Sequence, residues 1–327
     1  MYAATADAIQ GIGPESWPLY FNGAPPNTST AYWYDKNCGA GAAAHGKGCQ
    51  AFDEWYYAQS KGWNPKSFDP SSWIALMKRA GIRYFDFTAK HCEGFAMFQT
   101  ATLMHDCWDF DATGQKPPGI QPCANGPYHY SSHESFGRDI VGELITAARA
   151  GGILPGLYFS HADWVDPNLR LDSINPLVSG HITPGCTKDI TGNLSSAACD
   201  PALFNRTTDS KHWNRGVLRH RAQLLELLTK YGELFELSLD VNLQSTRNSD
   251  FNSDMQQTIM EMRAVAPNTL FRQRGIGGTA LTPTPGYGDY STPEETFPAT
   301  GIPGNWQVIY HGKCHHNQTS IIIDLSD

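Results

Sequence analysis

An aspartate closes a mostly apolar segment of the chain, where its carboxylate could take part in chemistry. Residues 234–240 read Leu-Phe-Glu-Leu-Ser-Leu-Asp and are expected to form a buried strand that ends at Asp240. A carboxylate in this place is held rigidly and is shielded from water on one side, which suits a nucleophile. The alternative interpretation is a structural carboxylate that caps the following loop.

A carboxylate that attacks the anomeric carbon of a sugar needs a second acid as its partner. The second acid protonates the departing oxygen, and the two carboxyl groups lie about 5 to 5.5 Å apart when the sugar keeps its configuration. Glu294 lies in a segment rich in Gly, Pro and Thr, which could fold over the end of the strand. Its neighbour Glu295 is the alternative acid, and Arg274 is placed to favour the ionised form of Asp240.

Helices and strands are expected to alternate along the chain, which is typical of a parallel sheet with helical crossovers. The clearest helix begins at Asp69, which caps it, and ends at Gly81. Its apolar stripe is expected to consist of Trp73, Leu76, Met77 and Ala80. Further helices are expected at 139–150, 215–232 and 255–265, and strands at 82–88, 153–160, 234–240 and 269–273.

Polar side chains follow several of these strands directly. They are Lys90, His91, Ser160, His161, Asp240 and Arg274. Barrel enzymes collect their active sites at the carboxyl ends of their strands. A nucleotide-binding sheet would instead carry a Gly-rich phosphate turn after a strand, and the sequence has none. The sequence therefore predicts an α/β fold of the (β/α)8 type, a TIM-like barrel.

The composition is that of a globular protein and excludes several classes of function. The chain has 327 residues, 40% of them hydrophobic, and a net charge of −8. It can therefore bury a large core, but it lacks the basic surface that nucleic acid requires. It contains no apolar run of about 20 residues, the length needed to cross a membrane. We expect neither nucleic acid nor a membrane as a partner.

Cysteines and glycosylation motifs together indicate an oxidising compartment, although the first residues lack the features of a signal peptide. The Asn-x-Ser/Thr motifs begin at Asn27, Asn193, Asn205 and Asn317. Pairing of near neighbours among the eight cysteines would give the disulfides Cys38–Cys49, Cys107–Cys123 and Cys186–Cys199. We expect a secreted, extracellular or lysosome-like location.

A series of short motifs occurs in a fixed order along residues 50–310. They are Phe68-Asp-Pro with Trp73, Thr88-Ala-Lys-His91, Glu93-Gly-Phe95, Arg138-Asp-Ile-Val-Gly-Glu-Leu144, Gly156-Leu-Tyr-Phe-Ser160, and the segment 223–232 before the strand of Asp240. In this order they resemble the motifs of the family-29 α-L-fucosidases.

The resemblance implies a retaining exo-α-L-fucosidase that removes terminal fucose by double displacement, without a metal or another cofactor. It implies that Asp240 is the nucleophile and Glu294 the acid/base. The residues that it places around the fucose are Glu54, Trp55, His91, Tyr158 and Arg274. The implied partner is a fucosylated glycan or glycoprotein, and a homo-oligomer is compatible with the sequence.

The sequence departs from the family pattern at several sugar-contacting positions. Cys92 stands where the family has a second histidine, Ser238 where it has an aromatic residue, and residues 11–13 where it has the His-Trp-Gly that ends the first strand. The chain also stops before the expected last strand and β-sandwich domain. We therefore expect residues 1–327 to form one catalytic barrel domain with a degenerate first strand, with loop insertions around 20–50, 105–135 and 161–213.

These departures motivate a second hypothesis, a catalytically impaired remnant of the same fold that binds fucose or another carbohydrate. A third hypothesis is a metal-dependent hydrolase built on His311, Cys314, His315 and His316, although their spacing matches no strong zinc motif. Near-neighbour pairing leaves Cys92 and Cys314, which both fall at expected strand ends. A disulfide between them is a further hypothesis.

Overall fold

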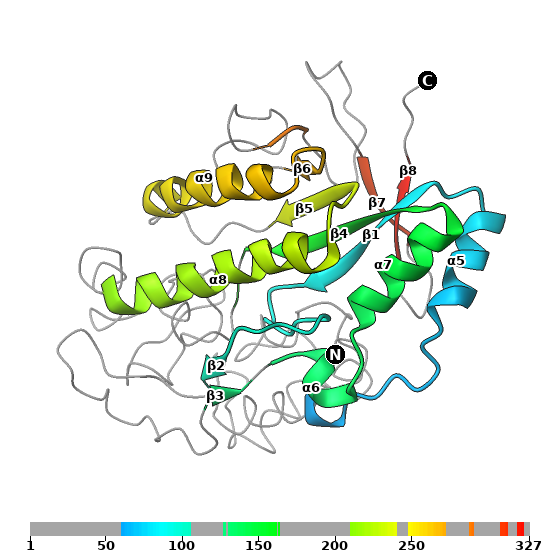
Figure 1. Ribbon diagram of the computed structural model, residues 1–327, viewed down its shortest axis with the longest axis horizontal. Coiled ribbons are helices and arrows are strands. Elements are labelled where there is room, and N and C mark those ends of the chain that lie inside the picture. The colour runs from blue at the N-terminus through cyan, green and yellow to red at the C-terminus, as the bar shows by residue number, and fades with distance from the viewer. Residues whose placement is uncertain are drawn as a thin grey trace, which may run out of the picture.

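A computed structural model describes residues 60–105, 127–128, 130–161, 163, 210–240, 248–272, 288–290, 308–312 and 319–323. They form a central sheet with long helices beside it (Figure 1). The helices are α5 (Pro70–Arg79), α6 (Ser132–Phe136), α7 (Ile140–Gly151), α8 (Ser210–Tyr231) and α9 (Asn248–Val265). The strands are β1 (Tyr84–Lys90), β2 (Met104–His105), β3 (Pro127–Tyr128), β4 (Leu154–Ser160), β5 (Glu236–Asp240), β6 (Leu270–Arg272), β7 (Val308–Gly312) and β8 (Thr319–Ile323).

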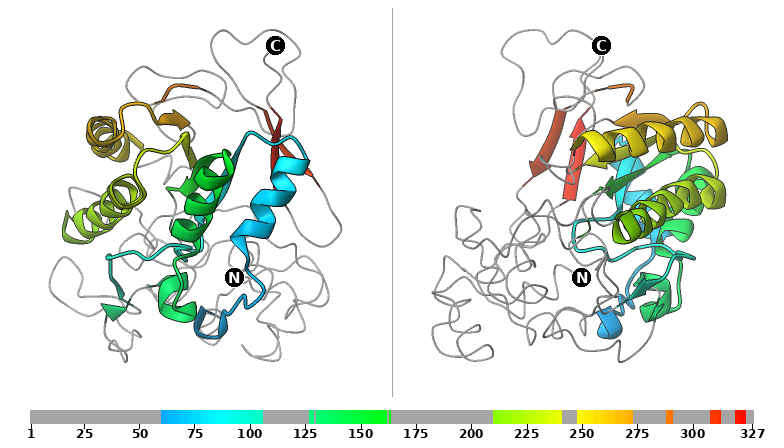
Figure 2. Two further views of the ribbon diagram at one scale, coloured as in Figure 1. Left: turned by 45° about the vertical axis from the view of Figure 1, so that its right-hand side comes forward. Right: turned by 90° about the vertical axis from the view of Figure 1, so that its left-hand side faces the viewer.

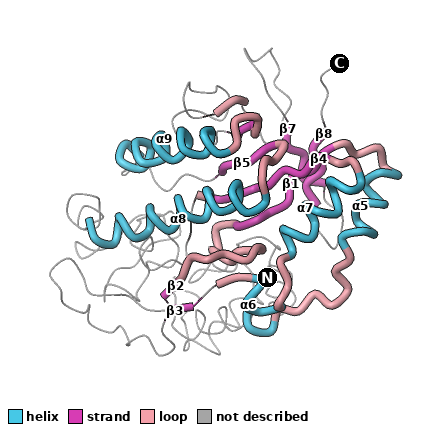
Figure 3. The backbone as a smooth tube through the Cα atoms, in the orientation of Figure 1, coloured by secondary structure: helices cyan, strands magenta, loops and turns pink. Residues whose placement is uncertain are grey.

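Strands β1, β4, β5 and β6 form one parallel sheet in the order in which they occur along the chain. Figure 3 draws the strands in magenta, with β1, β4 and β5 labelled. In the register, Asp86 of β1 lies beside Gly156 of β4. Ser238 of β5 lies between Tyr158 of β4 and Arg272 of β6. A doubly wound sheet reverses its strand order at a switch point. Here each strand pairs with the strand of this sheet that follows it in sequence, as neighbouring strands do in a barrel. The described part of the sheet is an open arc.

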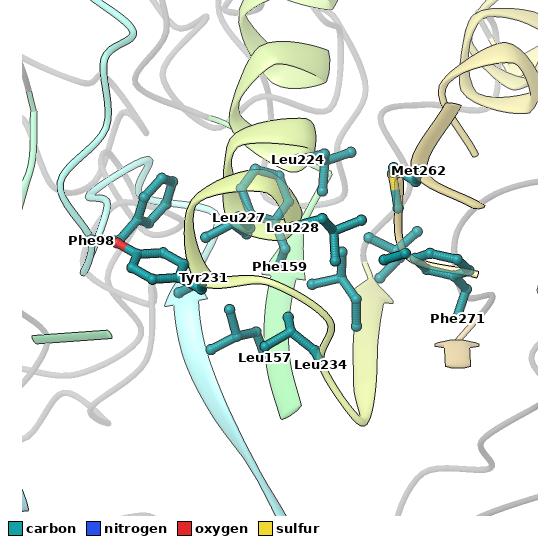
Figure 4. Packing of buried hydrophobic residues seen from close by; sticks show 14 of the residues in the cluster. Phe98, Leu157, Phe159, Leu224, Leu227, Leu228, Tyr231, Leu234, Met262 and Phe271 are labelled. Carbon is teal, nitrogen blue, oxygen red and sulfur yellow. The ribbon is translucent and has the colours of Figure 1, made fainter. Parts of the chain in front are cut away.

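The helices α5, α7, α8 and α9 lie on one face of this sheet, with α5 beside α7 and α8 beside α9 (Figure 2). Alternate strand residues point toward them, so Leu157, Phe159, Leu237 and Leu239 are fully buried. Side chains of α8 and α9 complete the core (Figure 4). The labelled members of this cluster are Phe98, Leu157, Phe159, Leu224, Leu227, Leu228, Tyr231, Leu234, Met262 and Phe271. This packing leaves the opposite face of the strands for other chemistry.

Helix α5 confirms the expected caps but buries a different residue from the one predicted. Asp69 accepts a hydrogen bond from the Ser71 amide at the start, and Gly81 follows the helix with a φ of 77°. Of the predicted stripe only Met77 is confirmed, since it packs partly buried against the core, whereas Trp73 and Leu76 are 42% and 58% exposed and Ala80 is exposed. The buried residue is Ile74, whose side chain fills the space left by Gly151 of α7. The stripe failed because α5 packs mainly against the neighbouring helix α7, while its Trp73 also meets the Phe87 ring of β1.

Element boundaries differ from the expectations by a few residues. The strand expected at 82–88 is β1, and it extends to Lys90, so this lysine belongs to the strand rather than to the loop after it. The antiparallel pair β2 and β3 and the helix α6 lie at 104–136, largely in a range assigned to a loop insertion. The antiparallel pair β7 and β8 was not anticipated, and β8 lies next to β1. Among the described helices, none is both long and apolar enough to cross a membrane.

The burial of Ile74 predicts a large difference between two similar substitutions in α5. Ile74→Ala removes buried methyl groups from the cluster around Phe68, Ile140 and Leu144, and is expected to lower the free energy of unfolding by about 2–5 kcal/mol. The matched control Leu76→Ala changes an exposed side chain and is expected to stay within about 0.5 kcal/mol of the parent. Urea unfolding of both variants measures the difference, and equal losses would contradict this packing.

Candidate active site

Asp240 ends β5 on the face of the sheet opposite the helices, together with Glu236 and Ser238. Its side chain is 12% exposed, and the contacts of Tyr158 and Arg272 meet at the same carboxylate oxygen. The hydroxyl of Tyr158 donates a hydrogen bond to Oδ2 over 3.1 Å, and Nη2 of Arg272 lies 3.4 Å from Oδ2. Both contacts favour the ionised carboxylate.

Tyr158 and His91 lie together at the ends of the neighbouring strands. Their rings stack with centroids 5.2 Å apart, and His91 Nδ1 accepts a hydrogen bond from the Cys92 amide over 2.8 Å. Burial, and next the charge of Asp240, hold the pKa of Tyr158 well above its ordinary value. Tyr158 therefore remains a phenol and keeps the proton that it donates. The structure thus brings together three of the residues selected from the sequence.

Sequence reasoning did not find Arg272, and it expected Arg274 to be the cation that favours the ionised form of Asp240. The guanidinium of Arg272 is 1% exposed and lies 5.5 Å from the centroid of the Tyr158 ring. Phe271 packs among the helix-facing residues, so strand alternation directs Arg272 to the side of Asp240. That alternation was the available signal. The other selected residues, Arg274, Glu54, Trp55, Glu294 and Glu295, lie outside the described residues.

Cys92 is a free thiol, which corrects the hypothesis of a disulfide with Cys314. Its Sγ lies 3.3 Å from Ser160 Oγ, and burial raises the pKa of the thiol to about 12. The side chain is 2% exposed, so it is a protonated and enclosed group. Cys314 itself, and all six cysteines of the three predicted disulfides, lie outside the described residues.

A second polar cluster lies at the carboxyl ends of β1 and β4. Lys90 and Arg219 both pair with Asp163, at 3.7 and 2.9 Å. Nδ1 of His161 lies 3.1 Å from Nε2 of His220, and the His161 amide donates to the backbone oxygen of Asp240 over 2.7 Å. Through this last bond the cluster fixes the backbone that carries the candidate nucleophile.

Further acidic residues lie deeper in the same face. Glu236 is 1% exposed and accepts a hydrogen bond from the Tyr290 hydroxyl over 2.5 Å, and the Ser238 hydroxyl donates to Asp86. Tyr290 pairs with Arg272 in a short parallel bridge, which extends the sheet beyond β6. Sequence reasoning did not find Asp86, Glu236 or Tyr290 as site residues.

This arrangement can present a fixed, ionised carboxylate to a substrate at the carboxyl ends of parallel strands. Such a group can act as a nucleophile or can stabilise a developing positive charge. In the described part of the chain, no group of three or more His, Cys, Asp or Glu side chains is placed to hold a metal ion.

Comparison with protein families points to one family over most of the chain. The family described as "Alpha-L-fucosidase" matches residues 24–315. A putative α-L-fucosidase of Caenorhabditis elegans is 28% identical over 148 residues, which are 45% of this chain and 23% of that protein. The tissue α-L-fucosidase of Rattus norvegicus is 33% identical over 114 residues, 35% of this chain and 20% of that protein. The matched segments thus span about a quarter or less of these curated relatives.

Solved structures share the fold. An α-L-fucosidase isoenzyme of Paenibacillus thiaminolyticus superposes with a TM-score of 0.54 at 24% identity, over 78% of this chain and 51% of that one. A family-29 enzyme of Bacteroides thetaiotaomicron gives a TM-score of 0.54 at 19% identity, over 86% of this chain and 51% of the other. The prediction of a TIM-like barrel fold is confirmed, with β1, β4, β5 and β6 forming part of its parallel sheet.

The histidine pair predicts a loss of stability in acid. Burial is the largest cause that lowers the pKa of His161, to about 3, and that of His220 well below 6.5. Below about pH 6.5 the unfolded chain therefore binds protons that the folded chain does not. The two neutral histidines make their whole contribution to the free energy of unfolding above that pH. Toward pH 3 the free energy of unfolding falls by about 1.4 kcal/mol per pH unit for each histidine.

Urea unfolding as a function of pH measures this loss. His220→Phe removes one of the two groups, so we expect its slope between about pH 6 and pH 4 to be shallower by one histidine's share. The matched control His133→Gln, in α6 and outside the pair, is expected to keep the slope of the parent. Identical slopes in the parent and His220→Phe would show that the pair does not resist protonation.

Proposed function

Because the chain belongs to the α-L-fucosidase family, we propose that it acts as a retaining exo-α-L-fucosidase with Asp240 as the nucleophile. The observation that carries this proposal is the placement of the Asp240 carboxylate. It lies at the carboxyl end of β5, nearly enclosed, between the hydroxyl of Tyr158 and the guanidinium of Arg272. A carboxylate held ionised in this way is suited to attack on an anomeric carbon.

The reaction follows the two steps of a retaining mechanism. A carboxylate oxygen of Asp240 forms a bond to C1 of the fucose while the bond from C1 to the leaving oxygen breaks, and the acid/base donates its proton to that oxygen. In the second step the same acid/base takes a proton from water, and the water oxygen displaces Asp240 from C1. The released fucose keeps its anomeric configuration.

Glu294 is the proposed acid/base, and Glu295 is the alternative. The nearest described residue is Tyr290, which pairs with Arg272 at the edge of the sheet. Two hydrogen bonds hold the chain there. The Asp289 amide donates to the backbone oxygen of Phe271, and the Phe271 amide donates to Asp289 Oδ2, each over 2.8 Å. Four residues of chain span at most about 14 Å. Because Tyr290 lies beside Arg272, this short connection supports the proposal that Glu294 lies on the side of the site nearest Arg272.

The substrate proposed is a fucosylated glycan or glycoprotein. His91 and Tyr158, which stack beside Asp240, are proposed to contact the fucose, as are Glu54, Trp55 and Arg274. A secreted or lysosome-like location is proposed from the eight cysteines and the glycosylation motifs. An impaired carbohydrate-binding protein is the competing function, because Cys92 and Ser238 stand at positions where the family has a histidine and an aromatic residue.

The first test replaces the proposed nucleophile. Asp240→Asn keeps the shape of the side chain but removes its charge, so we expect kcat for an aryl α-L-fucoside to fall by at least about 1,000-fold. Nuclear magnetic resonance of the parent reaction should show retained configuration. Asp69→Asn, which changes an exposed helix cap, is the matched control and should keep full activity.

Two outcomes would reject this assignment. Turnover that persists in folded Asp240→Asn would remove Asp240 from the mechanism. Fucose binding by the parent chain in calorimetry, without any turnover, would instead favour the carbohydrate-binding protein.

The second test removes the hydrogen bond to the nucleophile. Tyr158→Phe deletes a donor to a charged acceptor, a contact of about 1.5–3 kcal/mol, so kcat/KM is expected to fall about 10- to 100-fold. The acid limb of the pH profile should move to higher pH, because the ionised carboxylate loses a donor. Tyr231→Phe removes a hydrogen bond to Asp139 and is the matched control, expected to lose stability but not kcat/KM. An unchanged acid limb in Tyr158→Phe would contradict this role.

A further inference from the structure

Two acidic side chains, Asp86 and Glu236, meet on the inner face of the sheet in the region of Asp240. They come from β1 and β5, the two strands that border β4. Between them lies Gly156, where a Cβ atom would collide with Asp86 Oδ1 and would lie 2.7 Å from Glu236 Cγ. The two carboxyl groups therefore occupy the space above this glycine that any other residue would fill.

The hydrogen bonds to this pair leave one oxygen of each acid without a donor. The Ser238 hydroxyl donates to Asp86 Oδ2, and the Tyr290 hydroxyl donates to Glu236 Oε2. Asp86 Oδ1 and Glu236 Oε1 are closed to water and receive no hydrogen bond from a hydroxyl or N–H group of the described residues, but the two carboxyl groups lie within hydrogen-bonding reach of each other. A buried acceptor without a donor is costly. One proton bound between the two acids would supply a donor to both.

The charges nearby do not allow both acids to ionise. Burial raises the pKa of Asp86, and burial together with the charge of Asp86 holds the pKa of Glu236 well above its ordinary value. Two carboxylates that share a buried site cannot both be charged. The described groups that face the pair are Ser238, Tyr290 and the guanidinium of Arg272. The same guanidinium also pairs with Asp240.

We infer that Asp86 and Glu236 share one proton, and that the single negative charge left on the pair positions Arg272 against Asp240. The two acids do not touch the substrate, so they are positioning residues. Their kinetic consequence rests on the proposed fucosidase function. The shared proton itself does not, and it can be measured without any substrate.

Infrared difference spectroscopy at about pH 7 measures how many carboxyl groups of the pair are protonated. Asp86→Asn and Glu236→Gln should each lose one carbonyl band of a protonated carboxyl group, because the acid that remains has lost its acidic neighbour, still accepts a hydroxyl hydrogen bond and faces the guanidinium of Arg272, and is therefore ionised. The double variant Asp86→Asn/Glu236→Gln should lose the same band and no more. Glu261→Gln, an exchange of a carboxyl for an amide on α9, is the matched control and should lose none.

The other two charge states give different spectra and would overturn the inference. If both acids were protonated, the double variant would lose twice the band of either single variant. If both were ionised, none of the variants would lose a band. Should the double variant fail to fold, Asp86→Ser/Glu236→Gln gives the same comparison.

The pH profile of kcat/KM then tests the effect on Arg272 and Asp240. Each single variant keeps one negative charge and should keep the acid limb within about 0.3 pH units of the parent. The double variant removes this charge, so Asp240 should ionise more easily and the acid limb should move down by about one pH unit. A merely structural role predicts no such shift, and its absence would overturn the positioning role. A chain without turnover would reject the fucosidase proposal, while the infrared result would still decide the shared proton.

Discussion

The arrangement of the site depends on keeping the buried charge of Arg272 compensated. An enclosed guanidinium is costly unless anions and hydrogen-bond acceptors face it. Asp240 lies 3.4 Å away, the ring of Tyr158 lies against the cation, and Asp86 adds negative charge from β1. Removing Asp240, or the single negative charge of the Asp86 and Glu236 pair, would leave the charge of Arg272 less compensated in a medium of low dielectric constant. The carboxylate at the end of β5 is therefore fixed by electrostatics as well as by the backbone.

The strands can hold such a polar interior because their other face is wholly apolar. Leu157 and Phe159 of β4 and Leu237 and Leu239 of β5 pack under α7, α8 and α9 without exposure. Since side chains alternate along a strand, the same residues that bury the core direct Tyr158, Ser238 and Asp240 the opposite way. The hydrophobic face stabilises the fold, and this offsets the cost of the polar face.

The sequence predicted the parts of this structure that depend on local patterns. The caps of α5, the alternation of helices and strands, and the place of Asp240 all follow from periodicity over a few residues. Arg272 was missed because it lies within the strand expected at 269–273, whereas site residues were sought among the polar residues that follow each strand. Ile74 was missed because a helix that contacts both a sheet and a neighbouring helix buries no simple stripe.

The acid pair could not be predicted, because its partners are about 150 residues apart and neither carries a local signal. Glu236 interrupts an apolar strand, and from sequence alone it is only an irregularity in the pattern. The meaning of Gly156 likewise depends on the register of three strands. Contacts of this kind are set by the assembled sheet rather than by any segment.

Tyr290 connects the two halves of the proposed active site. Its backbone pairs with Arg272, the cation that faces Asp240, and its hydroxyl donates to Glu236. The chain then continues toward Glu294, the proposed acid/base, four residues later. Burial and the charges of Glu236 and Asp86 hold the pKa of Tyr290 well above its ordinary value, so the phenol remains a donor. Tyr290 therefore links the buried acid pair to Arg272, which faces Asp240, and to the segment that leads to the proposed acid/base.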